Sequence, residues 1–169
     1  STVYFSPRLA TERLRVVKEV KENEVIIDFF AGIGSFPISI AHRKNAKIYS
    51  VDINPEAYKY VQENIKLNKL VGTVIPIEGD IRKVIDKLPL ANRIIMNLPG
   101  TAKEFLTVAI NHLQKDGILN YYEFSSDYET VIKRVEKAAY PRETDVLNIR
   151  KVKSQSPGVW HIALDMKIK

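Results

Sequence analysis

Two glycines follow an apolar run in the segment DFFAGIGSF. Asp28 closes that run, and Gly32 and Gly34 let the main chain turn tightly into a helix with no Cβ in the way of a ligand. A sharp strand-to-helix turn needs glycine with or without a ligand, so this spacing alone leaves both interpretations open. The ends of the next two apolar runs bear on the choice.

The next two apolar runs each end at an acid, Asp52 and Asp80. In VDINP, Asp52 is followed by Ile53 and can accept both hydroxyl protons of a ribose. In EGDIR, Asp80 can accept from an exocyclic adenine amine while Ile81 offers its backbone N–H to the ring. Either acid could instead cap the helix that follows it. Because ligands of such sheets bind at the carboxyl ends of the strands, the three strand ends together predict an adenosine cofactor.

The segment MNLPG, Met96 to Gly100, follows a fourth apolar run. Asn97 offers a donor and an acceptor to an amide-like base edge, and the Pro99 ring can pack on the base. A flipped or unstacked nucleobase fits these features. The alternative is an ordinary polar turn in which proline ends a strand. We expect the substrate to bind at this strand end.

Strands and helices must alternate to bring these segments together. Apolar runs predict parallel strands at residues 24–30, 46–52, 72–80, 92–97 and 117–124. Residues 127–140 predict a helix, and residues 143–154 and 158–169 an antiparallel hairpin on the sheet edge. Two crossover helices are predicted by apolar residues at helical spacing, namely Tyr58, Val61, Ile65 and Leu67 in one and Phe105, Val108 and Leu113 in the other.

This order of elements resembles the class I S-adenosylmethionine-dependent methyltransferase fold more than a nicotinamide-binding Rossmann domain. We therefore expect an α/β, Rossmann-like fold with a mostly parallel seven-stranded sheet, helices on both faces and a C-terminal antiparallel hairpin. Residues 1–169 are expected to form one catalytic domain. Within it, residues 1–23 would lie on the substrate and cofactor side, and residues 24–169 would form the core.

Composition narrows the possible functions. The 169 residues carry 26 Lys plus Arg against 20 Asp plus Glu, and the formal charge of +6 favours an anionic partner such as nucleic acid. Zero cysteines and three scattered histidines predict no metal site, and the lack of a phosphate-gripping lysine loop argues against a nucleotide triphosphatase. No apolar stretch reaches the ~18 residues of a membrane span, and no leader pattern opens the chain. We expect a cytoplasmic monomer with no membrane contact.

Five segments resemble the archaeal and eukaryotic tRNA (guanine-37, N1)-methyltransferases in order and spacing: YFSPRLATERLR, DFFAGIGSF, VDINP, GDIR and NLPGTAKEF. The first and last discriminate within the fold, whereas the middle three mark class I methyltransferases in general. The resemblance implies that S-adenosylmethionine methylates N1 of the guanosine immediately 3′ of a tRNA anticodon. The family's tRNA-binding regions and a transition-state arginine precede the position of Ser1, so we expect a catalytic portion. Ser35 departs from the proline that the family often has there.

The resemblance also implies roles for individual residues. Glu12 matches the general base, which must remove the proton that neutral guanine carries on N1, although an acid favoured at a helix start is the alternative. Arg13 matches a position beside the cofactor, or could meet phosphate or solvent. Tyr4 would wall the methyl-transfer pocket, or be an ordinary strand aromatic. Asn97 and Pro99 would hold the base, with Asn97 also touching the cofactor.

Three other functions stay open. An aminocarboxypropyltransferase of wybutosine synthesis has a similar scaffold and cofactor but transfers a different carbon group. A dual-specificity methyltransferase would act on a tricyclic guanosine derivative as well. In the third case the chain is a non-catalytic RNA-binding module of the same fold, for which phosphate contacts could come from Lys18, Lys21, Arg43, Lys44, Lys47, Lys151 and Lys153.

Overall fold

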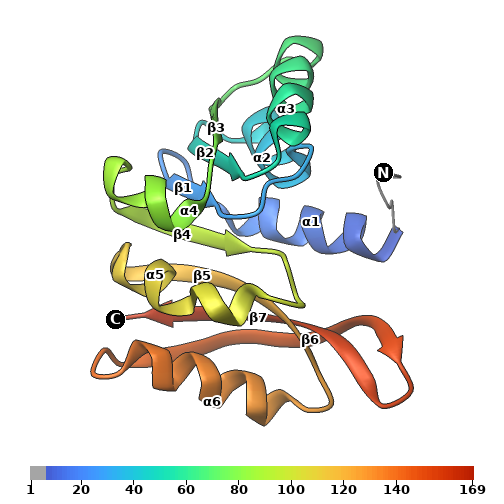
Figure 1. Ribbon diagram of the computed structural model, residues 1–169, viewed down its shortest axis with the longest axis vertical. Coiled ribbons are helices and arrows are strands. Elements are labelled where there is room, and N and C mark those ends of the chain that lie inside the picture. Colours follow the sequence, from blue (N-terminus) through green and yellow to red (C-terminus); the bar gives the residue numbers. More distant parts are fainter. Residues whose placement is uncertain (1–6) are drawn as a thin grey trace.

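A seven-stranded sheet forms the centre of the computed structural model, which describes residues 7–169 (Figure 1). The strands are β1 (Val25–Asp28), β2 (Lys47–Asp52), β3 (Thr73–Glu78), β4 (Ala91–Met96), β5 (Leu113–Ser125), β6 (Thr144–Ser156) and β7 (Val159–Ile168). Their order is β3-β2-β1-β4-β5-β7-β6, in which β1 to β5 pair in parallel. The expected α/β fold with a mostly parallel sheet is therefore confirmed.

The closing hairpin is also confirmed. Strand β7 pairs antiparallel with both β5 and β6, so it lies between them and β6 becomes the edge strand. The expected start of the fifth strand is wrong, because β5 already begins at Leu113, which pairs with Ala91 of β4. Helical spacing alone predicts Leu113 in the preceding helix. Pairing with the neighbouring strand outweighs that spacing.

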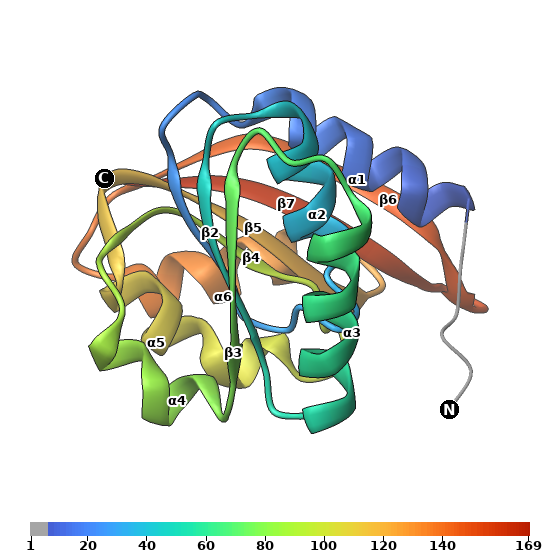
Figure 2. The same ribbon diagram turned by 90° about the horizontal axis from the view of Figure 1, so that it is seen from above.

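Helices cover both faces of the sheet (Figure 2). They are α1 (Pro7–Glu19), α2 (Ser35–Arg43), α3 (Pro55–Leu67), α4 (Ile81–Val84), α5 (Leu106–Asn111) and α6 (Tyr128–Ala139), with 3-10 turns η1 (Ile85–Lys87) and η2 (Ala102–Phe105). Within residues 7–169, no helix is long and apolar enough to cross a membrane. One expected core position is wrong: Leu67 is 81% exposed, because α3 packs through Ala57 and Val61 instead.

Alternating side chains along the central strands build two separate cores. Ile26 of β1 and Ile95 of β4 pack with Val16 of α1 on one face, while Ile27 and Ile94 face α5 and α6 on the other. All five side chains are fully buried. Burial of one such side chain contributes roughly 1.5–3 kcal/mol, so a one-residue slip of β1 or β4 would be costly. The two cores therefore fix which residues reach the sheet edge.

Side-chain caps start the helices that leave the strand ends. Asn54 Oδ1 accepts from the Glu56 N–H at 2.9 Å, with Pro55 as the first residue of α3. Asp80 caps α4 in the same way, with Oδ1 2.9 Å from the Arg82 N–H. The capping alternative thus describes Asp80 but not Asp52, since Asn54 caps α3. The Asp52 carboxylate is left for another role.

Candidate functional site

A cavity of about 520 Å³ opens at the carboxyl ends of β1 to β4. Five of the residues predicted to bind a cofactor lie in its wall: Gly32, Asp52, Ile53, Asp80 and Ile81. The wall also contains residues that the sequence did not single out as ligands, namely Phe29, Phe30, Gly79, Arg82, Leu98, Thr101, Glu104 and Phe105. The cavity is mixed in character, because its wall contains both aromatic rings and three carboxylates. Such a lining suits a flat aromatic group joined to a polar one.

Asp52 ties the first two strand ends together. Its Oδ2 accepts from the Gly32 N–H and its Oδ1 from the Asn54 N–H, each at 2.8 Å. A carboxylate oxygen has two acceptor positions, so one on each oxygen stays open for hydroxyl protons. Gly32 has a φ of 56°, and a Cβ on it would meet no heavy atom within 4 Å, which leaves its main chain approachable. These two residues form the polar floor of the cavity.

Gly34 has a different role from Gly32. Its φ is 85°, and a Cβ there would lie 3.1 Å from Cγ2 of Val61 on α3. It lines a separate hollow of about 200 Å³, together with Arg13 and Asn64. The structure therefore places Gly34 and Arg13 outside the main cavity. Close packing of α2 on α3 accounts for this glycine.

The Asp80 carboxylate is engaged by its neighbour. Arg82 reaches Asp80 Oδ1 with Nε at 3.1 Å and Oδ2 with Nη2 at 2.8 Å, and these hydrogen bonds lower the Asp80 pKa to about 2. The same guanidinium lies 4.9 Å from the ring centroid of Phe105, which packs edge-on against Phe30 at 5.0 Å. A cation–π contact therefore closes one side of the cavity. Helical spacing in the sequence predicts only a core role for Phe105, so this contribution to the wall was missed.

Asp28 lies beneath the cavity and not in its wall. The side chain is 1% exposed, and burial raises its pKa to about 7. The Phe30 N–H, 3.2 Å from Oδ1, opposes that shift, while the nearby Asp52 charge adds to it. Asp28 therefore carries a proton more readily than an ordinary aspartate, at a place where a cationic ligand would favour its ionised form.

Glu12 lies in a groove between α1 and β6, apart from the cavity. Its side chain is 5% exposed and bonds Arg15, Arg150 and the Tyr122 hydroxyl. Burial raises the Glu12 pKa above its ordinary value, and the Arg15 charge opposes the rise. Arg150 comes from the far end of the chain, and nothing in the sequence pointed to it. Tyr4, predicted to form part of the wall of the methyl-transfer pocket, lies outside the described residues.

The MNLPG turn contacts both the cavity and strand β5, whose Tyr122 bonds Glu12. Leu98 reaches the cavity wall, whereas Asn97 and Pro99 do not. The Pro99 carbonyl accepts from the Phe124 N–H at 3.3 Å. Phe124 lies two residues beyond Tyr122 on β5, and Tyr122 O–H donates to Glu12 Oε1 at 2.9 Å. Strand β5 therefore connects the predicted base-holding turn to the predicted general base.

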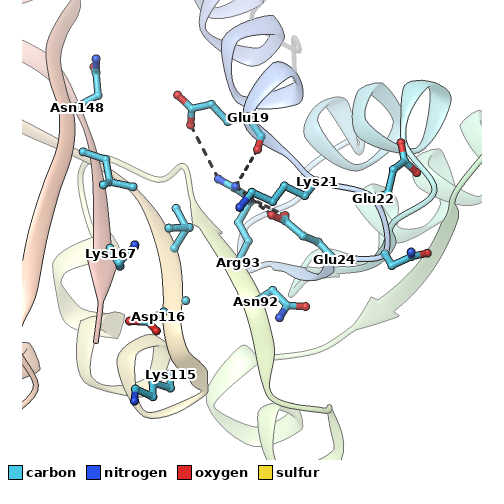
Figure 3. A pocket seen from close by; sticks show the side chains of 14 residues that line it. Glu19, Lys21, Glu22, Glu24, Asn92, Arg93, Lys115, Asp116, Asn148 and Lys167 are labelled. Carbon is cyan, nitrogen blue, oxygen red and sulfur yellow. Dashed lines mark hydrogen bonds and ion pairs between the residues drawn. The ribbon is translucent and has the colours of Figure 1, made fainter.

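A hollow of about 650 Å³ lies at the opposite, amino-terminal edge of the sheet (Figure 3). Its central side chain is Arg93, which is 3% exposed and donates to Glu24 Oε2 at 2.9 Å and to Asn120 Oδ1 at 2.9 Å. The Glu19 carbonyl accepts from the same guanidinium at 3.4 Å. These contacts satisfy a buried charge and fasten the end of α1 to β4. Among residues 7–169, no cluster of three metal-binding side chains occurs.

The family model of the TRM5/TYW2 methyltransferase domain matches residues 1–147. The chain belongs to this family. A Methanocaldococcus jannaschii relative named tRNA (guanine(37)-N(1))-methyltransferase Trm5b is 45% identical over 166 residues, 98% of this chain and 47% of that protein. A second relative from the same organism, named tRNA(Phe) (4-demethylwyosine(37)-C(7)) aminocarboxypropyltransferase, is 39% identical over 94% of this chain and 65% of its own.

Solved structures agree with this assignment to the TRM5/TYW2 family. The complex of aTrm5 and tRNALeu matches with a TM-score of 0.89 at 43% identity, over 100% of this chain and 48% of that one. M. jannaschii TYW2 in complex with AdoMet matches with a TM-score of 0.89 at 36% identity, over 99% of this chain and 78% of that one. This TRM5/TYW2 domain spans about half the length of the first of these curated relatives, at 47%.

The buried Asp28 predicts a pH-dependent stability. Its folded pKa of about 7 lies above the ordinary value of 3.8, so the folded state holds the proton more tightly and stability falls as pH rises from about 4 to about 7. Asp28→Asn removes that loss. Thermal unfolding should show that Asp28→Asn becomes more stable than the wild type as pH rises across this range. The difference in the free energy of unfolding should be on the order of 1–4 kcal/mol above pH 7. Asp86→Asn, an exposed change on η1, is the control; parallel curves for Asp28→Asn and wild type would contradict the assignment.

Proposed function

We propose that this protein transfers a methyl group from S-adenosylmethionine to N1 of guanosine 37 in tRNA. The observation that carries the proposal is the Asp52-floored cavity at the strand ends, with the MNLPG turn beside it. Relatives that share 45% and 39% identity are named for reactions at position 37 of tRNA. The proposal includes a cytoplasmic, monomeric enzyme that binds the anticodon region of tRNA.

The cavity fits the adenosine part of S-adenosylmethionine. Asp52 would accept the ribose hydroxyl protons at its two open acceptor positions, and Ile53, 69% exposed, would cover one face of the nucleoside. The Ile81 N–H opens helix α4 and has no helical acceptor, so it is available to the adenine ring. Asp80 would accept from the adenine amine beside its contacts to Arg82. Bound S-adenosylmethionine supplies an electrophilic methyl group on a sulfonium sulfur.

The target base would enter from the MNLPG side. Asn97 offers both hydrogen-bonding senses to the guanine edge, Pro99 packs on the ring, and Tyr4 would complete the pocket wall. Glu12 would take the N1 proton as the new N–CH3 bond forms and the C–S bond breaks, with the electron pair passing to sulfur. Burial raises the Glu12 pKa, which increases the affinity of its carboxylate for the proton it would take. Arg13 is proposed to contact the cofactor.

Product identity separates the proposed reaction from its nearest rivals. Incubation of the full-length protein with S-adenosylmethionine and an unmodified tRNA transcript should give a nucleoside with one methyl group in place of the N1 proton of guanosine 37. Mass spectrometry of nuclease digests measures this. A gained aminocarboxypropyl group would support the rival that transfers a different carbon unit. Methylation of a tricyclic guanosine derivative as well would indicate dual specificity, and no product with any of these substrates would favour a non-catalytic RNA-binding module.

The cofactor placement predicts a shared loss of affinity. Asp52→Ala should weaken S-adenosylmethionine and S-adenosylhomocysteine alike, by about tenfold or more, because the ribose contacts do not involve the methyl group. Isothermal titration calorimetry gives both dissociation constants. Asp86→Ala removes an exposed acid outside the cavity wall and serves as the control. Unchanged affinity for both ligands in Asp52→Ala would refute this placement.

The general-base role predicts a kinetic signature for Glu12. Glu12→Gln keeps the shape but not the base, so the single-turnover methylation rate should fall by about 10²–10⁴-fold while cofactor affinity hardly changes. In the wild type the rate should rise as the carboxyl ionises and then level off. In Glu12→Gln that dependence should vanish, with partial rescue at alkaline pH as guanine ionises.

The control for Glu12→Gln is Glu63→Gln, an exposed change on α3. It keeps the same chemical substitution and lies outside the groove and the cavity. Its rate and pH profile should match the wild type. If Glu12→Gln behaved in the same way, Glu12 would be only a helix residue and the proton would leave by another route.

A further inference from the structure

The Glu12 carboxylate is saturated with donors. Arg15 Nη2 donates to Oε1 at 2.8 Å and Arg15 Nε to Oε2 at 3.3 Å. Arg150 Nε donates to Oε2 at 2.8 Å, Arg150 Nη2 contacts Oε1, and the Tyr122 hydroxyl donates to Oε1 at 2.9 Å. A carboxylate offers about four acceptor positions. No position is left for a proton from guanine N1 until one donor leaves.

Arg15 is the more firmly anchored of the two arginines. It also donates to Asp165 Oδ2 at 2.7 Å and contacts Glu19 one turn farther along α1. Asn120 Nδ2 donates to Asp165 at 2.7 Å, and the buried Arg93 donates to Asn120 at 2.9 Å. Figure 3 shows Arg93 with its other partners, Glu19 and Glu24. Removal of Arg15 from this network would break its 2.7 Å pair with the buried Asp165 and leave that carboxylate with one cationic contact among residues 7–169, the long 3.4 Å one to Arg150, which is costly.

Arg150 is less constrained. It lies on β6, the edge strand. Besides Glu12 it contacts one other carboxylate, that of Asp165, and this contact from Nη1 to Oδ2 is long at 3.4 Å. Its remaining partner is Asn148 Oδ1 at 2.8 Å, on the same strand. If Arg150 moved, Glu12 and Asp165 would both keep Arg15. Arg150 is therefore the donor that can leave Glu12 at the lower cost.

The groove beside Arg150 attracts anions. It has a volume of about 610 Å³, and a single carboxylate, Glu12, faces five cationic side chains along its walls: Arg8, Arg15, Lys18, Arg150 and Lys151. The cations still outnumber the acids when Asp165 and Glu19, which contact Arg15, are included. A guanidinium forms paired hydrogen bonds with phosphate as readily as with carboxylate. A phosphate in this groove would therefore compete with Glu12 for Arg150.

We propose that the groove between α1 and β6 binds a phosphate of the substrate RNA, and that this phosphate draws Arg150 away from Glu12 and so frees the general base. The inference rests on the proposed function, in which Glu12 acts as that base. It makes Arg150 a positioning residue that couples RNA binding to catalysis. Without RNA the carboxylate stays covered, and with RNA one acceptor position opens toward the guanine.

The charge on Glu12 reports this exchange directly. Its carboxyl ¹³C resonance, identified by its loss in Glu12→Gln, can be followed over pH with and without an unmodified tRNA transcript. In the wild type, RNA should move the titration midpoint upward, because the carboxylate loses one cationic partner. In Arg150→Ala the midpoint should be raised already, and RNA should add little. The titratable groups that face Glu12 are Arg15 and Glu19 on α1, Tyr122 on β5, Arg150 on β6, and His161 and Asp165 on β7.

RNA affinity provides the second measurement. Arg150→Ala should weaken binding of the transcript about tenfold and reduce the slope of log affinity against log salt by about one, as loss of one phosphate contact requires. In the kinetics, Arg150→Ala should mainly raise the RNA concentration that gives half the maximal rate. Arg150→Lys keeps a charge without the paired donors and should lie between Arg150→Ala and the wild type. Lys18→Ala should weaken RNA binding similarly but leave the Glu12 midpoint of the free protein in place.

Two results would overturn the inference: a Glu12 midpoint that RNA does not move in the wild type, or unchanged RNA affinity in Arg150→Ala. A failure of the proposed function looks different. In that case N1-methylguanosine would not form, although RNA still moved the Glu12 midpoint. Formation of N1-methylguanosine with a static Glu12 signal would reject the Arg150 exchange alone.

Discussion

Charges buried beneath α1 must be paired, and this requirement fixes where the helix lies on the sheet. Arg15 bonds Glu12 on its own helix and Asp165 on β7, and Arg93 on β4 bonds Glu24 ahead of β1. A shift of α1 by one turn would break the pairs that this helix makes with other elements, Arg15–Asp165 and Glu12–Arg150, and leave ions in an apolar surrounding, at a cost of several kcal/mol each. The position of the predicted general base is thus a consequence of charge pairing.

The same arrangement keeps the predicted general base apart from the predicted cofactor site. The cavity is built at the strand ends by Gly32 and Asp52, whereas Glu12 occupies a groove on the α1 face. Strand β5 joins the two regions, because Tyr122 contacts Glu12 and Phe124 contacts the MNLPG turn. A base placed at that turn would lie beside the cavity and next to the strand that contacts Glu12. Substrate binding is therefore the event that can bring both sets of residues into one reaction.

The position of β7 between β5 and β6 determines which charged side chains lie at the groove. It places Asp165 next to Asn120 and leaves Arg150 on an edge strand, opposite Ala163. Had β6 paired directly with β5, Arg150 would have had two neighbouring strands and less freedom to move. On the same edge strand, Lys151 is exposed to solvent. The hairpin thus contributes a movable cation as well as closing the sheet.

The sequence alone determined the features that are local. These are the alternating strands and helices, the closing hairpin, the Gly32 turn and the strand-end acids. Each depends on residues that are close together in the sequence, where spacing fixes geometry. Tertiary structure decided the rest. Arg150 meets Glu12 across 138 positions of sequence, and Arg15 meets Asp165 across 150. Such contacts depend on the register of β7 against its neighbours and on where α1 packs. Neither leaves a periodic signal, because a pairing between distant elements is set by the whole sheet and not by the spacing of residues along the chain.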